Sequence, residues 1–321
     1  MQTTPQHMNA MAVDEFGHSD KLTLHTLPVP TVDAGEVLIR IEIAGVGIWD
    51  EMEREGNLIY NEVHFPRVLG GECAGTIVAI GDGVEQFAVG DRVYAQTFMN
   101  DKGGSYAQYV AVSEKTIAPI PDGLDSLMAG GLPIAGITAL SNLQALGTGN
   151  ETTLMLWGAS GGVGHVALQL AKRMGARVFA IASGADGVAL ATQLGADEVV
   201  DGHSDDIAER ARAFAPNGFD GALVLVGGDT VQSTLSLVRQ GGIISFPNGV
   251  LPEPKAPDGV ELKKANGFAD RMLLDQLNRS IDMGEFQVHI AQTFPLEEAA
   301  KAQDAMKQHY LGKIVLRVSG E

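Results

Sequence analysis

A glycine-rich turn at residues 159–164 constrains the fold of this chain more than any other feature. It reads Ala159-Ser160-Gly161-Gly162-Val163-Gly164, and it joins an apolar, strand-like run, 153–157, to a helix-like run, 165–174. At such a junction, backbone N–H groups and the positive end of the helix dipole face an anion. Gly161 lets the backbone approach the phosphates, and Gly164 lets the helix pack closely on the sheet. We predict a dinucleotide site. The alternative is a purely structural glycine turn, because Ala159 stands where the usual fingerprint has its first glycine.

The chain after residue 124 alternates between short apolar runs and helical spacing, which predicts a doubly wound parallel sheet. The expected strands are 153–157, 177–182, 198–200, 222–226 and 242–246, and the expected helices are 126–146, 165–174, 187–194, 205–214 and 230–239. Residues 248–267 are rich in Pro and Gly and are predicted as a loop. A helix at 268–283, a strand at 287–294, a helix at 296–309 and a strand at 313–318 are expected to follow.

The chain before residue 124 has β-rich runs that Gly and Pro interrupt, which predicts a compact, mostly antiparallel β-domain. These runs are 37–43, 75–80, 92–95 and 106–112. Residues 1–12 are polar at the start and are predicted as a loose extension before the first strand. They lack the charged-then-apolar layout of a secretion signal.

Composition excludes several classes of function. The net charge of −18 repels nucleic acid and anionic membrane. No apolar run is long enough to span a bilayer. The single cysteine, Cys73, can form neither an internal disulfide nor a cysteine-based zinc site. We therefore expect a cytoplasmic protein with no nucleic-acid or membrane partner.

Six stretches, in order and at matching distances, resemble one family. They are residues 44–56, 90–93, 103–110, 132–139, the glycine turn and 309–316. Together they resemble the zinc-free quinone oxidoreductases of the medium-chain dehydrogenase/reductase superfamily. The resemblance implies an α/β protein with a β-rich GroES-like catalytic domain, residues 1–123 and 286–321, and a doubly wound Rossmann domain, residues 124–285. It also implies a homodimer.

The resemblance also bears on zinc. Alcohol dehydrogenases of the superfamily hold a catalytic zinc with a cysteine near Gly47 or Ile48 and a histidine just before Glu72. This chain has glycine at Gly47 and the sequence Gly70-Gly71 before Glu72. Without ligands there is no Lewis acid to polarise a carbonyl oxygen. We predict no metal, and an acceptor that is already electron-poor, such as a quinone or an α,β-unsaturated carbonyl.

The choice of nicotinamide cofactor depends on the end of the second strand of the nucleotide domain. An NAD site usually places a carboxylate there, whereas this chain has Ala182-Ser183. Ser183 could donate a hydrogen bond to a 2′-phosphate, so we predict NADPH. NADH is not excluded, because the Lys or Arg and the Tyr that clamp the phosphate in NADPH-using relatives are absent. His203 is read as a surface histidine.

Several further residues match family site positions. Thr138 is expected near the nicotinamide, or else it bonds back into its own helix. Asp50 and Arg54 match the family's cleft-facing segment, or else they form an exposed i, i+4 ion pair. Asp50 and Tyr60 are the candidate catalytic residues; Tyr60 is a weak acid within the range of a proton donor, and its alternative is a packing tyrosine. Val226, Phe246 and Lys313 are the remaining cofactor candidates, and Lys313 is alternatively a solvated lysine.

The sequence thus predicts a zinc-independent, NADPH-dependent reductase of a quinone or an α,β-unsaturated carbonyl. Two alternatives stay open. One is a dedicated biosynthetic enoyl reductase, which the unusual loop 252–259 favours. The other is a non-catalytic nucleotide-binding relative, which the missing phosphate clamp and the residues Gly47 and Met52, in place of the family's Asn and Tyr, keep open.

Overall fold

The computed structural model describes residues 4–59, 62–204 and 206–318. Contacts divide the chain into two compact units. The first unit comprises residues 1–134 and 269–321, and the second unit comprises residues 135–268. Residues 124–134 and 269–285 thus belong to the first unit by contacts, whereas the sequence assigned them to the nucleotide domain. The domain boundaries at 123/124 and 285/286 stay a prediction.

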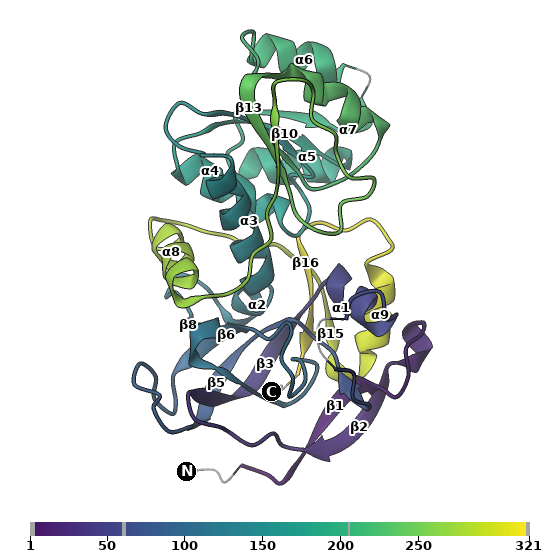
Figure 1. The fold of residues 1–321 in the computed structure, drawn as a ribbon, viewed down its shortest axis with the longest axis vertical. Helices are drawn as coiled ribbons and strands as arrows, with labels where there is room; N and C mark the ends of the chain where they lie inside the picture. The colour runs from purple at the N-terminus through teal and green to yellow at the C-terminus, as the bar shows by residue number, and fades with distance from the viewer. Residues whose placement is uncertain (1–3, 60–61, 205, 319–321) are drawn as a thin grey trace. The chain divides into compact units, whose positions relative to one another are not determined.

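The second unit is built on a six-stranded parallel sheet (Figure 1). Its strands are β9 (Thr153–Trp157), β10 (Arg177–Ala182), β11 (Glu198–Asp201), β12 (Phe219–Val224), β13 (Val238–Phe246) and β14 (Glu261–Lys264). They stand in the order β11-β10-β9-β12-β13-β14. Counted from β9, this is the order 3-2-1-4-5-6 of a doubly wound dinucleotide-binding sheet. The predicted fold of this region is confirmed.

Helices alternate with these strands along the chain. They are α3 (Pro133–Ala145), α4 (Gly164–Arg173), α5 (Gly184–Gln193), α6 (Ile207–Phe214) and α7 (Asp229–Thr234). The strands carry the aromatic core residues Phe179, Phe219 and Phe246, which are buried in one cluster with Ile244. The central strands β9, β10 and β12 are buried along most of their length, as continuous hydrophobic runs require.

The first unit contains a three-stranded and a seven-stranded sheet (Figure 1). The small sheet has the order β2-β1-β4. The large sheet has the order β15-β16-β3-β5-β6-β8, and β7 pairs with β3. The strands are β1 (His7–Val13), β2 (Thr23–Pro28), β3 (Glu36–Val46), β4 (Arg67–Val68), β5 (Glu72–Ile80), β6 (Arg92–Gln96), β7 (Tyr109–Ser113), β8 (Ile117–Pro119), β15 (Ile290–Pro295) and β16 (Lys313–Arg317). Among these strands, β15 and β16 pair in parallel with each other, and all other pairs are antiparallel. The predicted, mostly antiparallel β-domain is therefore confirmed, and the last strands of the chain belong to it.

Among its described residues, the first unit also contains the helices α1 (Ile48–Arg54), α2 (Ser126–Gly130), α8 (Arg271–Ile281) and α9 (Ala299–Ala305). Helices α1 and α9 come from distant parts of the sequence and lie side by side (Figure 1). Single-turn 3-10 helices, η1 (Ser19–Lys21), η2 (Glu114–Thr116), η3 (Leu235–Leu237) and η4 (Leu296–Glu298), complete the elements.

Four sequence-based expectations about elements were wrong. The expected extension contains β1, because Met8, Ala10 and Ala12 on one face pack against Val68 and Ala107. The expected helix 126–146 is interrupted before Pro133, which lacks the N–H that a helix interior needs. The expected helix 230–239 ends at Thr234, and Val238 and Arg239 already belong to β13. The expected loop 248–267 contains β14, a charged strand that pairs with β13 at the end of the sheet.

Candidate functional site

The glycine turn lies between β9 and α4, as the sequence predicted. Gly158 has a φ of +82°, which favours glycine, and the N–H groups of Gly158 and Ala159 both donate to the carbonyl of Ile181 in β10. Gly161 N–H donates to Gly158 O at 3.1 Å, and helix α4 begins at Gly164. Hydrogen bonds to β10 and the start of α4 therefore fix the conformation of the turn.

The two outer glycines of the turn serve different purposes. A side chain at Gly164 would overlap the carbonyl oxygen of Gly158, so this glycine is required for packing. A methyl group at Gly161 would meet only Gly158 O, at 3.4 Å, with nothing else within 4 Å. The space in front of Gly161 is therefore open, as a turn that accepts a phosphate group requires. Of the other turn residues, Ala159 and Ser160 are buried, whereas Gly162 and Val163 are half-buried.

The ends of β10 and β11 meet beside this turn. Ser183 follows β10, and its N–H donates to the Oγ of Ser160 at 3.4 Å. Asp201 ends β11, and its Oδ1 accepts from Gly184 N–H at 3.3 Å and from His203 Nδ1 at 2.9 Å. The backbone N–H and ring of His203 lower the pKa of Asp201. A carboxylate thus lies close to the residue that follows Ser183, although it comes from the next strand and not from β10.

The remaining cofactor candidates of the second unit lie on α3 and at the ends of β12 and β13. Thr138 is buried in α3, and its carbonyl accepts from Asn142 Nδ2 at 2.8 Å. Val226 comes two residues after β12 and is exposed. Phe246 ends β13 with its ring in the core, 5.7 Å from the Lys264 ammonium.

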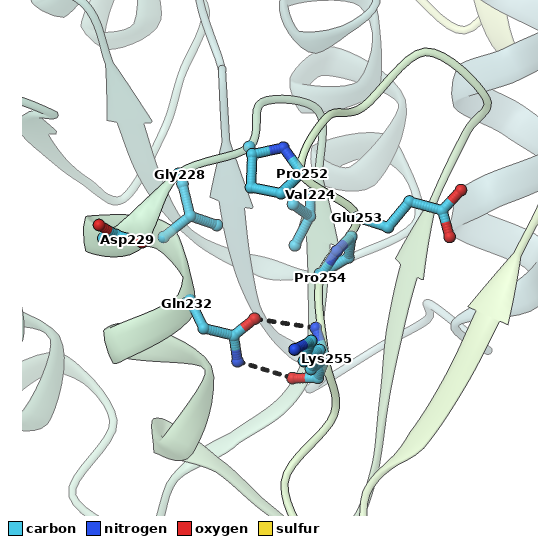
Figure 2. Close-up of a pocket in the computed structure, with 10 residues that line it drawn as sticks. Val224, Gly228, Asp229, Gln232, Pro252, Glu253, Pro254 and Lys255 are labelled. Carbon is cyan, nitrogen blue, oxygen red and sulfur yellow. Dashed lines mark hydrogen bonds between the residues drawn. The ribbon is translucent and has the colours of Figure 1, made fainter.

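A small cavity of about 210 Å³ opens beside the end of β12 (Figure 2). Its walls are Val224, the start of α7 and the loop residues Pro252 to Lys255. Gln232 holds this loop with two hydrogen bonds of 2.8 Å, one to the N–H and one to the carbonyl of Lys255. The unusual loop that the sequence singled out is therefore fixed against α7.

In the first unit, Asp50 is buried near the start of α1, with 1% of its surface exposed. Its Oδ2 accepts from Gly47 N–H at 2.8 Å and from the Tyr106 hydroxyl at 3.0 Å. Its Oδ1 is buried without a hydrogen-bond partner among the described residues. Burial raises the pKa of Asp50 to about 7, so a fraction of these carboxyls hold a proton at neutral pH.

Arg54 is also fully buried, and the alternative of an exposed ion pair with Asp50 is therefore wrong. Its guanidinium donates to Gln303 of α9, to the carbonyl of Gly17, and to the carboxylates of Glu51 and Glu55. Arg54 thus ties α1 to α9. Tyr60, the second catalytic candidate, lies outside the described residues.

Glu72 and Lys313 form a buried ion pair that the sequence did not indicate. Lys313 Nζ lies 2.6 Å from Glu72 Oε1, and these side chains are 5% and 1% exposed. The other carboxylate oxygen of Glu72 accepts from Ile134 N–H at 2.7 Å, in the first turn of α3, where a negative charge is favoured. The alternative of a solvated Lys313 is wrong.

The Trp49 ring lies against two glycines, Gly47 and Gly71, and Ile134 also lies against Gly71. A methyl group at Gly47 would lie 2.5 Å from Trp49 Nε1, and one at Gly71 would lie 3.3 Å from Trp49 Cδ1. The Lys313 ammonium lies 5.9 Å from the indole centroid. The sequence analysis did not single out Trp49. The signal that could have done so is the presence of glycine at both expected ligand positions, Gly47 and Gly71, with a tryptophan two residues after Gly47.

Comparison with known proteins identifies the family. Residues 33–122 match the model of the alcohol dehydrogenase GroES-like domain, and residues 162–260 match that of the zinc-binding dehydrogenase. The chain is 30% identical to the 2-methylene-furan-3-one reductase of Solanum lycopersicum, over 83% of this chain and 70% of that protein. It is 28% identical to the chloroplastic NADPH-dependent alkenal/one oxidoreductase of Arabidopsis thaliana, over 97% and 80% of the two chains. It is also 28% identical to the quinone oxidoreductase of Rattus norvegicus, over 98% and 99%.

Solved structures agree with this assignment. An NAD-dependent alcohol dehydrogenase has a TM-score of 0.88 at 27% identity, and the match covers 97% of this chain and all of that one. A mycobacterial protein complexed with NADPH has a TM-score of 0.82 at 27% identity, with the same coverage. The chain belongs to the quinone oxidoreductase-like group of the medium-chain dehydrogenase/reductase superfamily, and it is an oxidoreductase.

Zinc does not fit the residues present. The two positions where the family resemblance expects ligands are Gly47 and Gly71, and the Trp49 ring lies against both. Among the residues that the structure describes, no three His, Cys, Asp or Glu side chains are grouped so as to hold a metal ion. In the same part of the chain, no helix is both long and apolar enough to cross a membrane.

Proposed function

We propose that this oxidoreductase transfers a hydride from NADPH to a quinone or an α,β-unsaturated carbonyl, without zinc. The observation that carries the proposal is the open glycine turn at the carboxyl end of β9, in a sheet of dinucleotide-binding order. The names of the relatives, which include quinone, alkenal/one and methylene-furanone as substrates, support this acceptor class. All these acceptors are electron-poor enough to take a hydride without a Lewis acid.

The residues proposed to hold the cofactor are those around the open turn. The backbone of residues 159–164 would bind the pyrophosphate at the start of α4. Ser183, Val226, Phe246 and Thr138 would contact the rest of the dinucleotide, and Lys313 stays a proposed contact although Glu72 already pairs with its ammonium. A bound reduced nicotinamide supplies the hydride.

We also propose that the enzyme prefers NADPH over NADH. It is supported by Ser183 at the position where NAD sites usually carry a carboxylate, and by the NADPH dependence in the name of the Arabidopsis relative. Asp201 works against it, because its carboxylate accepts from Gly184 N–H, one residue after Ser183. NADH therefore stays the alternative reductant.

Asp50 is the proposed proton donor. As the hydride reaches the acceptor carbon, negative charge develops on the acceptor oxygen, and the proton on Asp50 would pass to that oxygen. The carboxylate left behind keeps its hydrogen bonds from Gly47 N–H and the Tyr106 hydroxyl and takes up a new proton from water. Its pKa of about 7 suits a donor that works at neutral pH.

An assay of NADPH and NADH oxidation tests the proposal. Protein freed of metal by a chelator is mixed with a panel of quinones and enones, and the nicotinamide absorbance is followed. We expect turnover that the chelator does not diminish. Loss of activity with the chelator and its return with zinc would contradict zinc independence. An NADH affinity more than about tenfold above that for NADPH would contradict the cofactor choice.

The role of Asp50 has its own test. Because the protonated carboxyl is the donor, kcat should fall as the pH rises through about 7. Asp50→Asn should lower kcat by about a hundredfold and abolish this fall. Glu53→Gln, which changes a half-buried carboxyl of α1, is the matched control and should keep the fall. An unchanged profile in Asp50→Asn would remove Asp50 from the chemistry.

A dedicated enoyl reductase is the second candidate, favoured by the loop that Gln232 fixes beside the small cavity. Such an enzyme would reduce its own enone and ignore simple quinones in the same assay. Nucleotide binding without turnover on any acceptor would instead favour a non-catalytic relative. We also propose that the protein is cytoplasmic and that it forms a homodimer.

A further inference from the structure

The imidazole of His165 is buried at the start of α4 and bonds back to the glycine turn. His165 is the second residue of α4, and none of its surface is exposed. Its Nδ1 lies 2.8 Å from the carbonyl oxygen of Gly161, and its backbone N–H donates to the same oxygen at 3.1 Å. Because a carbonyl oxygen can only accept, Nδ1 carries the proton of this hydrogen bond. The Gly161 carbonyl therefore accepts two hydrogen bonds from one residue.

These two hydrogen bonds fix the direction of a neighbouring N–H group. The carbonyl of Gly161 and the N–H of Gly162 belong to one peptide unit, which is trans. Such a unit is planar, and its N–H points opposite to its C=O. While the Gly161 carbonyl points toward His165, the Gly162 N–H must point away from His165.

The N–H groups of Gly162 and Val163 are the donors that the turn leaves over. Within the described part of the chain, neither of them donates a hydrogen bond. Both residues are half-buried and directly precede the ten-residue helix α4. Unpaired N–H groups at the start of a helix are the groups that bind a phosphate. The direction of the Gly162 N–H therefore matters for the proposed pyrophosphate site.

The peptide unit between Gly161 and Gly162 has little steric restraint of its own. Neither residue has a Cβ, so both can adopt backbone conformations that other residues avoid. Reversing this unit would present the carbonyl oxygen of Gly161 in place of the Gly162 N–H, and that oxygen would repel a phosphate. The two donors of His165 oppose this reversal, because it would break both hydrogen bonds.

We propose that His165 is a positioning residue for the dinucleotide. Its Nδ1–H holds the peptide unit between Gly161 and Gly162 in the orientation that presents the Gly162 N–H to the pyrophosphate. This inference rests on the proposed function and deepens it, because it assigns a role to a residue behind the turn. His165 acts through this peptide unit and takes no part in hydride transfer.

Two variants of similar shape test the proposal. His165→Asn keeps a donor, because Nδ2 of asparagine is as many bonds from the backbone as Nδ1 of histidine, whereas His165→Leu puts a methyl group there. Calorimetry gives the affinity for NADPH and for NADH, and the nucleotide that wild type binds more tightly is compared. We expect His165→Leu to weaken binding by about tenfold or more, that is about 1.4 kcal/mol, and His165→Asn to stay within about threefold of wild type. Wild-type affinity in His165→Leu would overturn the proposal.

Gln169→Leu is the matched control. Gln169 is also buried in α4, and its Nε2 donates four residues back, to the carbonyl of His165 at 2.9 Å. That carbonyl lies inside the helix, so its direction does not depend on the side chain. Gln169→Leu should leave the nucleotide affinity unchanged. An equal loss of affinity in Gln169→Leu and His165→Leu would attribute the effect to a weakened helix and refute the positioning role.

Kinetics separate positioning from chemistry. Because His165 acts on binding alone, His165→Leu should raise KM for the nucleotide by the same factor as the dissociation constant and leave kcat unchanged. A lower kcat at unchanged KM would contradict the proposal.

Wild-type protein provides a test that does not depend on the folding of any His165 variant. With glycine labelled by ¹³C at the carbonyl and ¹⁵N at the amide, a spectrum that correlates the two nuclei shows only the second residue of each Gly-Gly pair, and Gly162→Ala identifies the signal of Gly162. We expect this amide proton to shift downfield when the nucleotide binds. A Gly162 signal that stays in place in the saturated complex would rule out the contact.

The two proposals fail in different ways. If wild-type protein binds neither NADPH nor NADH, the proposed function fails. If wild-type protein binds a nucleotide and turns over, but His165→Leu binds as tightly, only the role of His165 fails.

Discussion

Both units contain glycines at positions where a side chain would matter. The space beside such a glycine is open in the second unit and occupied by neighbouring side chains in the first unit. In the second unit, the space in front of Gly161 stays open. In the first unit, the Trp49 ring occupies the space beside Gly47, and Ile134 together with Trp49 occupies the space beside Gly71. A missing side chain is therefore no evidence of a binding site by itself; the neighbouring atoms decide whether the space is available to a ligand.

The electrostatics of the two units differ in the same way. The open turn presents backbone N–H groups at the start of α4, where an anion from outside would be stabilised. The first unit instead contains its own charge pair, Glu72 with Lys313, buried within the fold. The second unit therefore presents groups that would bind a charged ligand, whereas the buried charges of the first unit, Glu72 and Lys313, pair with each other. Variants in both units can test this contrast, and their expected effects on the free energy of unfolding differ in size.

The largest effect should come from breaking the buried ion pair. Lys313→Met leaves the buried Glu72 carboxylate with the Ile134 N–H as its remaining partner among the described residues, and it should lower the free energy of unfolding by about 3–5 kcal/mol. Urea unfolding measures the change. The double variant Lys313→Met/Glu72→Gln removes both charges and should recover part of the loss. A single variant as stable as wild type would show that the first unit does not depend on this pair.

A smaller effect should come from adding a methyl group at Gly47. Gly47→Ala forces the methyl against the Trp49 ring and should cost about 1–3 kcal/mol. In a Trp49→Ala background the same change should cost nothing further, so a double-mutant cycle gives the coupling. Gly123→Ala, in the same unit with open space around the new methyl, is the control. No coupling between residues 47 and 49 would mean that the indole does not fill this space.

The smallest effect on stability should come from Gly161→Ala, although its effect on binding should be clear. The new methyl makes only an ordinary contact with Gly158 O, so the free energy of unfolding should change by less than about 0.5 kcal/mol. The affinity for NADPH, measured by calorimetry, should fall by about tenfold or more, because the backbone can no longer approach the phosphates.

Two variants complete the test at Gly161. Gly164→Ala should instead destabilise the fold, because its methyl overlaps Gly158 O. Gly149→Ala, which has open space in the same unit, should change neither stability nor binding. Unchanged NADPH affinity in Gly161→Ala would argue against the turn as the pyrophosphate site.

Sequence reasoning predicted the features that depend on local patterns. The alternation of β9, α4 and β10 around the glycine turn is visible in the hydrophobic periodicity and in glycine spacing. Strand β14 was missed because its residues, Glu261 to Lys264, are mostly charged and lie at a sheet edge. It forms a strand only because β13 offers a free edge, and no local signal encodes that.

The polar groups of the first unit could not be predicted from local patterns. Glu72 and Lys313 are 241 residues apart in sequence, and only the return of β16 beside β3 brings them together. Likewise, the burial of Asp50 depends on Tyr106, which comes from a distant segment. Such contacts depend on topology, and a single sequence gives no distance between its segments.

The burial of Asp50 also links folding to proton exchange. With a pKa of about 7 in the fold and 3.8 as its ordinary value, the group is mostly protonated when folded and ionised when unfolded between those values. Unfolding near pH 5.5 therefore releases a proton to the buffer. The stability from Asp50 is full below about pH 4 and declines as the pH rises to about 7, by about 4 kcal/mol in all. In calorimetry, the enthalpy of unfolding should accordingly vary with the ionisation enthalpy of the buffer.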